Sequence, residues 1–160
     1  MTQLDANKDG KLDEKELEQS TALRNSLGDL DKDGDKAISR EELEARLTEM
    51  LASKVGIQAI SCRVMRGGQP VPNVEVKFVP EKFHGTSLAE ASGKSDAEGY
   101  VSLLSTGQTF PGIAPGFYRV EASLKDASGN ESLPAAVNTR TKLGYQISSR
   151  LRGGIEISIP

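Results

Sequence analysis

The chain has 160 residues, of which 36% are hydrophobic and 27% charged, and it carries a formal net charge of −3 with one Cys and one His. This composition excludes an internal disulfide, and it excludes a tetrahedral zinc site, which takes about four nitrogen or sulfur ligands. No apolar run reaches the roughly 18 residues of a membrane span, no signal-peptide pattern is visible, and no basic cluster indicates nucleic-acid binding.

The charge is divided unevenly along the chain. Residues 1–53 hold 14 acidic and 8 basic residues, whereas residues 54–160 hold 9 acidic and 12 basic residues. Such a division indicates two parts with different roles, and the acidic part is suited to binding cations.

The first feature is a run of oxygen-bearing residues at positions 5–16. A calcium ion takes about seven oxygen ligands, and a twelve-residue loop supplies them from its positions 1, 3, 5, 7, 9 and 12. Gly10 stands at position 6, where the turn needs a left-handed backbone that glycine adopts freely. Leu12, at position 8, is expected to face a second loop. The predicted ligands are Asp5, Asn7, Asp9, the backbone carbonyl of Lys11, Asp13 and Glu16.

Residues 31–42 fit the same template with one departure, because position 6 is Lys36. A register that begins at Asp29 would place Gly34 at position 6, but it would also place Arg40 at position 12, where a carboxylate must give both oxygens. We therefore reject that register. The predicted ligands are Asp31, Asp33, Asp35, the backbone carbonyl of Ala37, Ser39 through a water molecule, and Glu42. The alternative is a degenerate loop that supports the pair without holding calcium.

Helices are predicted after both loops. Leu17, Leu23 and Leu27 indicate a helix at residues 14–24, and Leu43 and Leu47, with Met50 or Leu51, indicate a second helix at residues 40–53.

With these features in place, residues 4–43 resemble a pair of EF-hands of the calmodulin type, which implies two bound calcium ions. The short distance between the loops implies a brief linking helix, and position 8 of the second loop is Ile38, so Leu12 and Ile38 are expected to pair. Dockerins also pair calcium loops, but their loops typically end in Asp, whereas both loops here end in Glu.

The pattern changes after a short linker at residues 53–55. Apolar residues then alternate with polar ones, and turns rich in Gly, Pro, Asn and Asp separate the runs, which predicts six or seven antiparallel strands. The last run, residues 155–159, alternates throughout. The alternating apolar residues are Ile60, Cys62 and Val64; Val74, Val76 and Phe78; Val101 and Leu103; Tyr118 and Val120; and Ile155, Ile157 and Ile159.

Residues 66–81, 91–100 and 115–120 give residues 56–160 a resemblance to transthyretin-like or carboxypeptidase-regulatory-like modules. That resemblance implies a β-sandwich that serves as an appended, non-catalytic part of an exported bacterial protein. Enzymatic relatives of this fold need more than one His, and only His84 is present. We expect His84 to be a solvated loop residue and Cys62 to be a buried thiol.

These observations predict an α+β fold in separate modules, with a helical EF-hand pair at 1–53 and a transthyretin-like or Ig-like β-sandwich at 56–160. The expected function is calcium binding without catalysis, in an exported protein whose sandwich is a structural or adhesive unit for a protein partner or a larger assembly. One alternative is an accessory region of a larger exported enzyme. Another is a calcium sensor, although Met1 and Met50 alone would supply the methionines that sensor grooves commonly carry.

Overall fold

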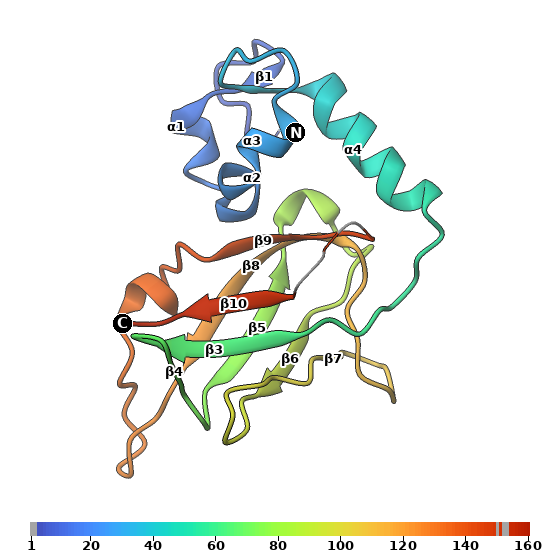
Figure 1. Ribbon diagram of the computed structural model, residues 1–160. Coiled ribbons are helices and arrows are strands. Elements are labelled where there is room, and N and C mark those ends of the chain that lie inside the picture. The colour runs from blue at the N-terminus through green and yellow to red at the C-terminus, as the bar shows by residue number, and fades with distance from the viewer. Residues whose placement is uncertain (1–2, 150, 152–153) are drawn as a thin grey trace.

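The computed structural model describes residues 3–149, 151 and 154–160. Figure 1 shows a small helical part, formed by the N-terminal third of the chain, lying over a larger part made of strands. Within the described residues, no helix is long and apolar enough to cross a membrane. The fold is mostly β, with a few short helices and many antiparallel strand pairs.

The two loops are joined by a small antiparallel sheet, as expected. Strand β1 (Lys11–Leu12) pairs with β2 (Ile38–Ser39), and Leu12 lies opposite Ile38. Both side chains are fully buried. This pairing fixes the two loops side by side.

The predicted helix at residues 14–24 is wrong, because the chain forms two helices there. Helix α1 (Glu14–Leu17) ends before Ser20, which caps the start of α2 (Thr21–Asn25) by accepting a hydrogen bond from the backbone N–H of Leu23 at 3.4 Å. Serine side chains bond readily to nearby backbone groups, so they favour a cap over a helix interior. A third short helix, α3 (Leu27–Leu30), leads into the second loop.

The second predicted helix is confirmed as α4 (Arg40–Ala52). Leu43 and Met50 are buried, Leu47 is partly buried, and Leu51 is exposed. A turn at residues 53–54 ends the helix, and an extended segment then leads to the first strand of the larger part.

Two sheets make up the larger part. The first has the order β7-β6-β5-β8-β9, and all of its pairs are antiparallel. The second has the order β10-β3-β4. The strands are β3 (Cys62–Arg66), β4 (Gln69–Pro70), β5 (Glu75–Pro80), β6 (Ala91–Lys94), β7 (Leu104–Ser105), β8 (Gly116–Ser123), β9 (Gly144–Ile147) and β10 (Ile155–Ser158), with short 3-10 helices η1 (Lys82–His84) and η2 (Ala135–Val137) between them.

This topology differs from the expectation in two respects. Strands β10 and β3 run parallel, with Ile155 opposite Cys62, so the strands are not all antiparallel. The described residues of this part form eight strands, not six or seven. The pattern did not indicate strand β6, because apolar and polar residues do not alternate there. Val101 lies in an isolated bridge instead of a strand, although its side chain is buried, as the pattern indicated.

Two apolar cores result. One lies between the two sheets and contains Cys62, Val76, Tyr118 and Ile157. The other lies among the helices, and it includes Phe117, which comes from strand β8. Neighbouring residues of a strand point to opposite faces, so β8 sends one aromatic ring into each core. The helical part therefore rests directly on the five-stranded sheet (Figure 1).

Candidate metal centres

The first loop is held by its own side-chain oxygens. Asn7 Oδ1 accepts a hydrogen bond from the N–H of Asp9 at 2.9 Å, and Asp9 Oδ1 accepts one from the N–H of Lys11 at 2.9 Å. Asp5 Oδ2 accepts one from the N–H of Gly10 at 3.1 Å. These bonds hold the backbone of the loop in a turn through the side chains at positions 1, 3 and 5.

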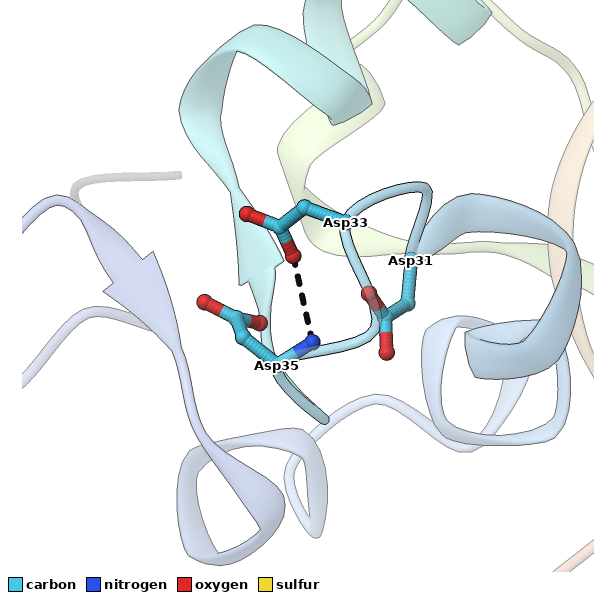
Figure 2. A group of neighbouring side chains, drawn as sticks. All are labelled: Asp31, Asp33 and Asp35. Atoms are coloured by element: carbon cyan, nitrogen blue, oxygen red, sulfur yellow. Dashed lines mark hydrogen bonds between the residues drawn. The ribbon is translucent and has the colours of Figure 1, made fainter.

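The second loop repeats these three bonds in the register that begins at Asp31. Asp33 Oδ1 accepts from the N–H of Asp35 at 3.1 Å, the bond drawn in Figure 2. Asp35 Oδ1 accepts from the N–H of Ala37 at 2.9 Å, and Asp31 Oδ2 accepts from the N–H of Lys36 at 2.9 Å. The structure thus brings together Asp31, Asp33 and Asp35, as Figure 2 shows, with one carboxylate oxygen of each within 4.8 Å of the others.

The glutamate at position 12 closes each loop. Glu16 Oε1 accepts from the N–H of Ala6 at 2.8 Å, and Glu42 Oε1 accepts from the N–H of Lys32 at 2.7 Å. The second oxygen of Glu42 accepts from the N–H of Ser39 at 2.8 Å. Burial alone would raise the pKa of Glu42, but the hydrogen bonds from Lys32 and Ser39 outweigh burial, so the pKa lies below its ordinary value. Glu42 is therefore ionised at neutral pH.

The remaining predicted ligands lie where a loop passes into its strand or helix. Asp13 Oδ1 accepts from the N–H of Glu16 at 2.9 Å, and Ser39 Oγ accepts from the N–H of Glu42 at 3.2 Å, so both residues cap the helices that follow. Lys11 lies opposite Ser39 in the β1–β2 pair, and Ala37 directly precedes β2.

One buried oxygen shows that the first loop fits a cation. Asp5 Oδ1 is buried and has no hydrogen-bond partner within the part of the chain that the structure describes. An unsatisfied buried oxygen of a charged group is costly, and a cation would satisfy it. In the second loop, the three clustered carboxylates repel one another, and a divalent cation among them would relieve that repulsion. Oxygen donors of this kind suit a hard cation such as calcium.

The helical part contacts the five-stranded sheet through hydrogen bonds and apolar packing that were not predicted from the sequence. Helix α2 lies along β9, where Asn25 Nδ2 donates to the carbonyl of Gly144 at 3.1 Å. The carboxylate of Glu81 is buried and accepts from the N–H of Ala22 at 3.0 Å. Phe117 completes the helical core from β8. The sequence carried one sign of this contact. Phe117 and Tyr118 are adjacent aromatic residues, which indicates a strand that is buried on both faces.

The expectation for His84 is wrong, because this residue is packed at the junction rather than solvated. Its ring lies 4.6 Å from the Phe83 ring and 6.1 Å from the Phe117 ring, between centroids. Its Nε2 accepts a hydrogen bond from the N–H of Phe117 at 3.0 Å. Burial lowers the pKa of His84 from 6.5 to about 4. Phe117 lies 33 positions further along the sequence, so the polar residues around His84 gave no sign of this contact.

Comparison with known proteins supports the assignment of the first loop. A family model described as EF hand matches residues 1–19, which include the whole of that loop. This match suggests calcium binding. No curated protein and no solved structure matches the chain, so the resemblance of residues 56–160 to transthyretin-like modules stays a prediction.

Proposed function

We propose that residues 1–53 bind two calcium ions and that these ions have a structural role in a non-catalytic protein. The observation that carries this proposal is the internal repetition of the loops. Five hydrogen bonds of the first loop recur at the same positions of the second loop, and both loops end in a helix-capping glutamate.

Each ion would be held by six residues at equivalent positions. When bound, calcium supplies positive charge that neutralises the clustered carboxylates and gives the orphaned oxygen of Asp5 a partner. The chain contributes the enclosing turn, which its own hydrogen bonds already shape. The first ligand set is Asp5, Asn7, Asp9, Lys11, Asp13 and Glu16, and the second is Asp31, Asp33, Asp35, Ala37, Ser39 and Glu42.

A structural role is favoured over a sensor role by the position of Phe117. Calcium sensors open an apolar groove between their helices to receive a partner. Here the fully buried side chain of Phe117, from β8, already lies in the helical core, and Phe83 packs against the same core. The sheet therefore occupies the place that a partner helix would take.

For the larger part, we propose a transthyretin-like sandwich that serves as a structural or adhesive unit in an exported protein, with a protein partner or a larger assembly. Two sheets that share one core support this proposal. The one thiol of the chain is a poor nucleophile, because burial raises the pKa of Cys62 to about 12. An accessory region of a larger exported enzyme remains the alternative.

Thermal unfolding tests the structural role. The chelator-treated protein is melted alone, with calcium, and with magnesium as a control for ionic strength. We expect calcium to raise the midpoint, because a ligand that binds only the folded state stabilises it by about 2.7 kcal/mol at a hundred times its Kd. We also expect one transition, since the helices share a core with the sheet. A midpoint that does not respond to calcium would contradict the proposal.

A further inference from the structure

A lysine of the first loop reaches into the second. The ammonium of Lys11 forms an ion pair with Oδ2 of Asp35, a predicted ligand of the second site. The β1–β2 pair causes this contact, because it places Lys11 opposite Ser39 and so beside the second loop. The ion pair joins residues 24 positions apart in the sequence and crosses from one predicted calcium site to the other.

The two carboxylate oxygens of Asp35 have different partners. Asp35 Oδ1 is already used, because it accepts a hydrogen bond from the N–H of Ala37 at 2.9 Å. Oδ2 carries the ammonium of Lys11, so this carboxylate already faces a cation. Calcium and this ammonium are both cations, so they compete for the negative charge of the same carboxylate.

We infer that the ammonium of Lys11 is a competing cation in the second loop, which must leave Asp35 when calcium binds there and which therefore lowers the calcium affinity of the second site. This inference rests on the proposed calcium-binding function. In the first loop, Lys11 is expected to act only through its backbone carbonyl. Its side chain can therefore be changed without removing a ligand from the first site, which separates the two roles.

The test is calorimetric titration of calcium into four proteins after chelator treatment. They are the wild type, Lys11→Met, Lys11→Arg and Lys32→Met. Lys11→Met removes the ion pair, and Lys11→Arg keeps a cation in its place. Lys32→Met is the matched control, because it removes one positive charge from the second loop but leaves the Lys11–Asp35 pair intact.

We expect Lys11→Met to tighten the second site by about two- to fivefold, since exposed ion pairs have a small effect and both side chains are partly exposed. Any change at the first site should be smaller than this, because Lys11 is expected to give that site its backbone carbonyl and not its side chain. Lys11→Arg should resemble the wild type, and Lys32→Met should change the second site less than Lys11→Met. In a Glu42→Gln background, which disables the second site, the tightening caused by Lys11→Met should be lost.

Two results would overturn the inference. If two ions bind but Lys11→Met equals the wild type or Lys32→Met, Lys11 does not compete with calcium, and the proposed function still stands. If the wild type binds no calcium, the proposed function fails and the inference fails with it.

Discussion

Gly10 and Lys36 occupy the same place in their loops and have the same left-handed backbone, with φ of 86° and 68°. The N–H of each donates to the aspartate that begins its loop. Position 4 shows the reverse order, with Lys8 at φ 62° in the first loop and Gly34 at φ 79° in the second. Each loop therefore contains one left-handed glycine and one left-handed lysine.

The first prediction concerns this strained lysine. A residue with a Cβ pays roughly 1–2 kcal/mol for a left-handed backbone, whereas glycine adopts it freely. Lys36→Gly should therefore tighten calcium binding at the second site by about fivefold, which corresponds to about 1 kcal/mol. Calorimetry that resolves the two sites measures the change, and the first site should be unaffected.

Lys36→Asn is the companion variant, because asparagine tolerates the left-handed region and lacks the positive charge. We expect it to tighten the second site as well. If Lys36→Gly leaves the second site unchanged or weakens it, backbone strain at position 6 does not limit its affinity.

The second prediction concerns the close approach of α2 to β9. A Cβ on Gly144 would overlap the backbone of Thr21 and Ala22, which cannot move as a flexible side chain could. Gly144→Ala should therefore lower stability by about 1–3 kcal/mol, the usual cost of overpacking. Gly28→Ala in α3 is the matched control, because a Cβ there meets no atom within 4 Å and alanine favours a helix. Equal thermal midpoints for the two variants would show that this contact does not hold the parts together.

The third prediction concerns Phe117 and the exposure of apolar surface. Because this side chain fills the helical core, a dye that reports exposed apolar surface should not brighten when calcium is added to the wild type. Phe117→Ala should lower the free energy of unfolding by about 3–5 kcal/mol and should increase dye binding. A wild type that brightens strongly with calcium would support a sensor instead of a structural site.

The fourth prediction concerns pH. Burial lowers the pKa of His84 to about 4 in the folded protein, whereas the ordinary pKa of a histidine is 6.5. Between these two pH values, His84 is therefore protonated in the unfolded chain but neutral in the folded protein. The contribution of His84 to the free energy of unfolding is therefore fully present above about pH 6.5 and is lost as the pH falls towards 4. The loss is at most about 3 kcal/mol, and it is smaller if water reaches the ring.

His84→Gln isolates this effect, because glutamine can accept the hydrogen bond from Phe117 but does not titrate. Denaturant unfolding at several pH values should show a smaller loss of stability for the variant between pH 6.5 and 4. Burial raises the pKa of Glu81 and gives the opposite slope, but it does so in both proteins, so the difference reports His84. Parallel pH profiles would contradict the assignment.

The features that depend on local spacing could be predicted from the sequence. The Leu12–Ile38 pair and α4 follow from the twelve-residue pattern and from leucine spacing, and both are present. Likewise, the alternation of Val76 and Phe78 indicated β5, and that of Ile155 and Ile157 indicated β10.

The features that depend on tertiary contacts could not be predicted in this way. The partial burial of His84 arises from Phe117, which lies on strand β8. The ion pair between Lys11 and Asp35 likewise requires both loops to be placed side by side. Neither of these pairings leaves a periodic signal along the chain.

The central claim is that both loops bind calcium, and calorimetric titration of the chelator-treated wild type, Glu16→Gln and Glu42→Gln tests it most directly. Each substitution replaces the bidentate carboxylate of one loop with an amide that cannot give two oxygens. We predict two ions for the wild type and one strong site for each variant, with the first loop lost in Glu16→Gln and the second lost in Glu42→Gln. A wild type that binds no calcium, or variants whose stoichiometry and affinities equal those of the wild type, would contradict the account.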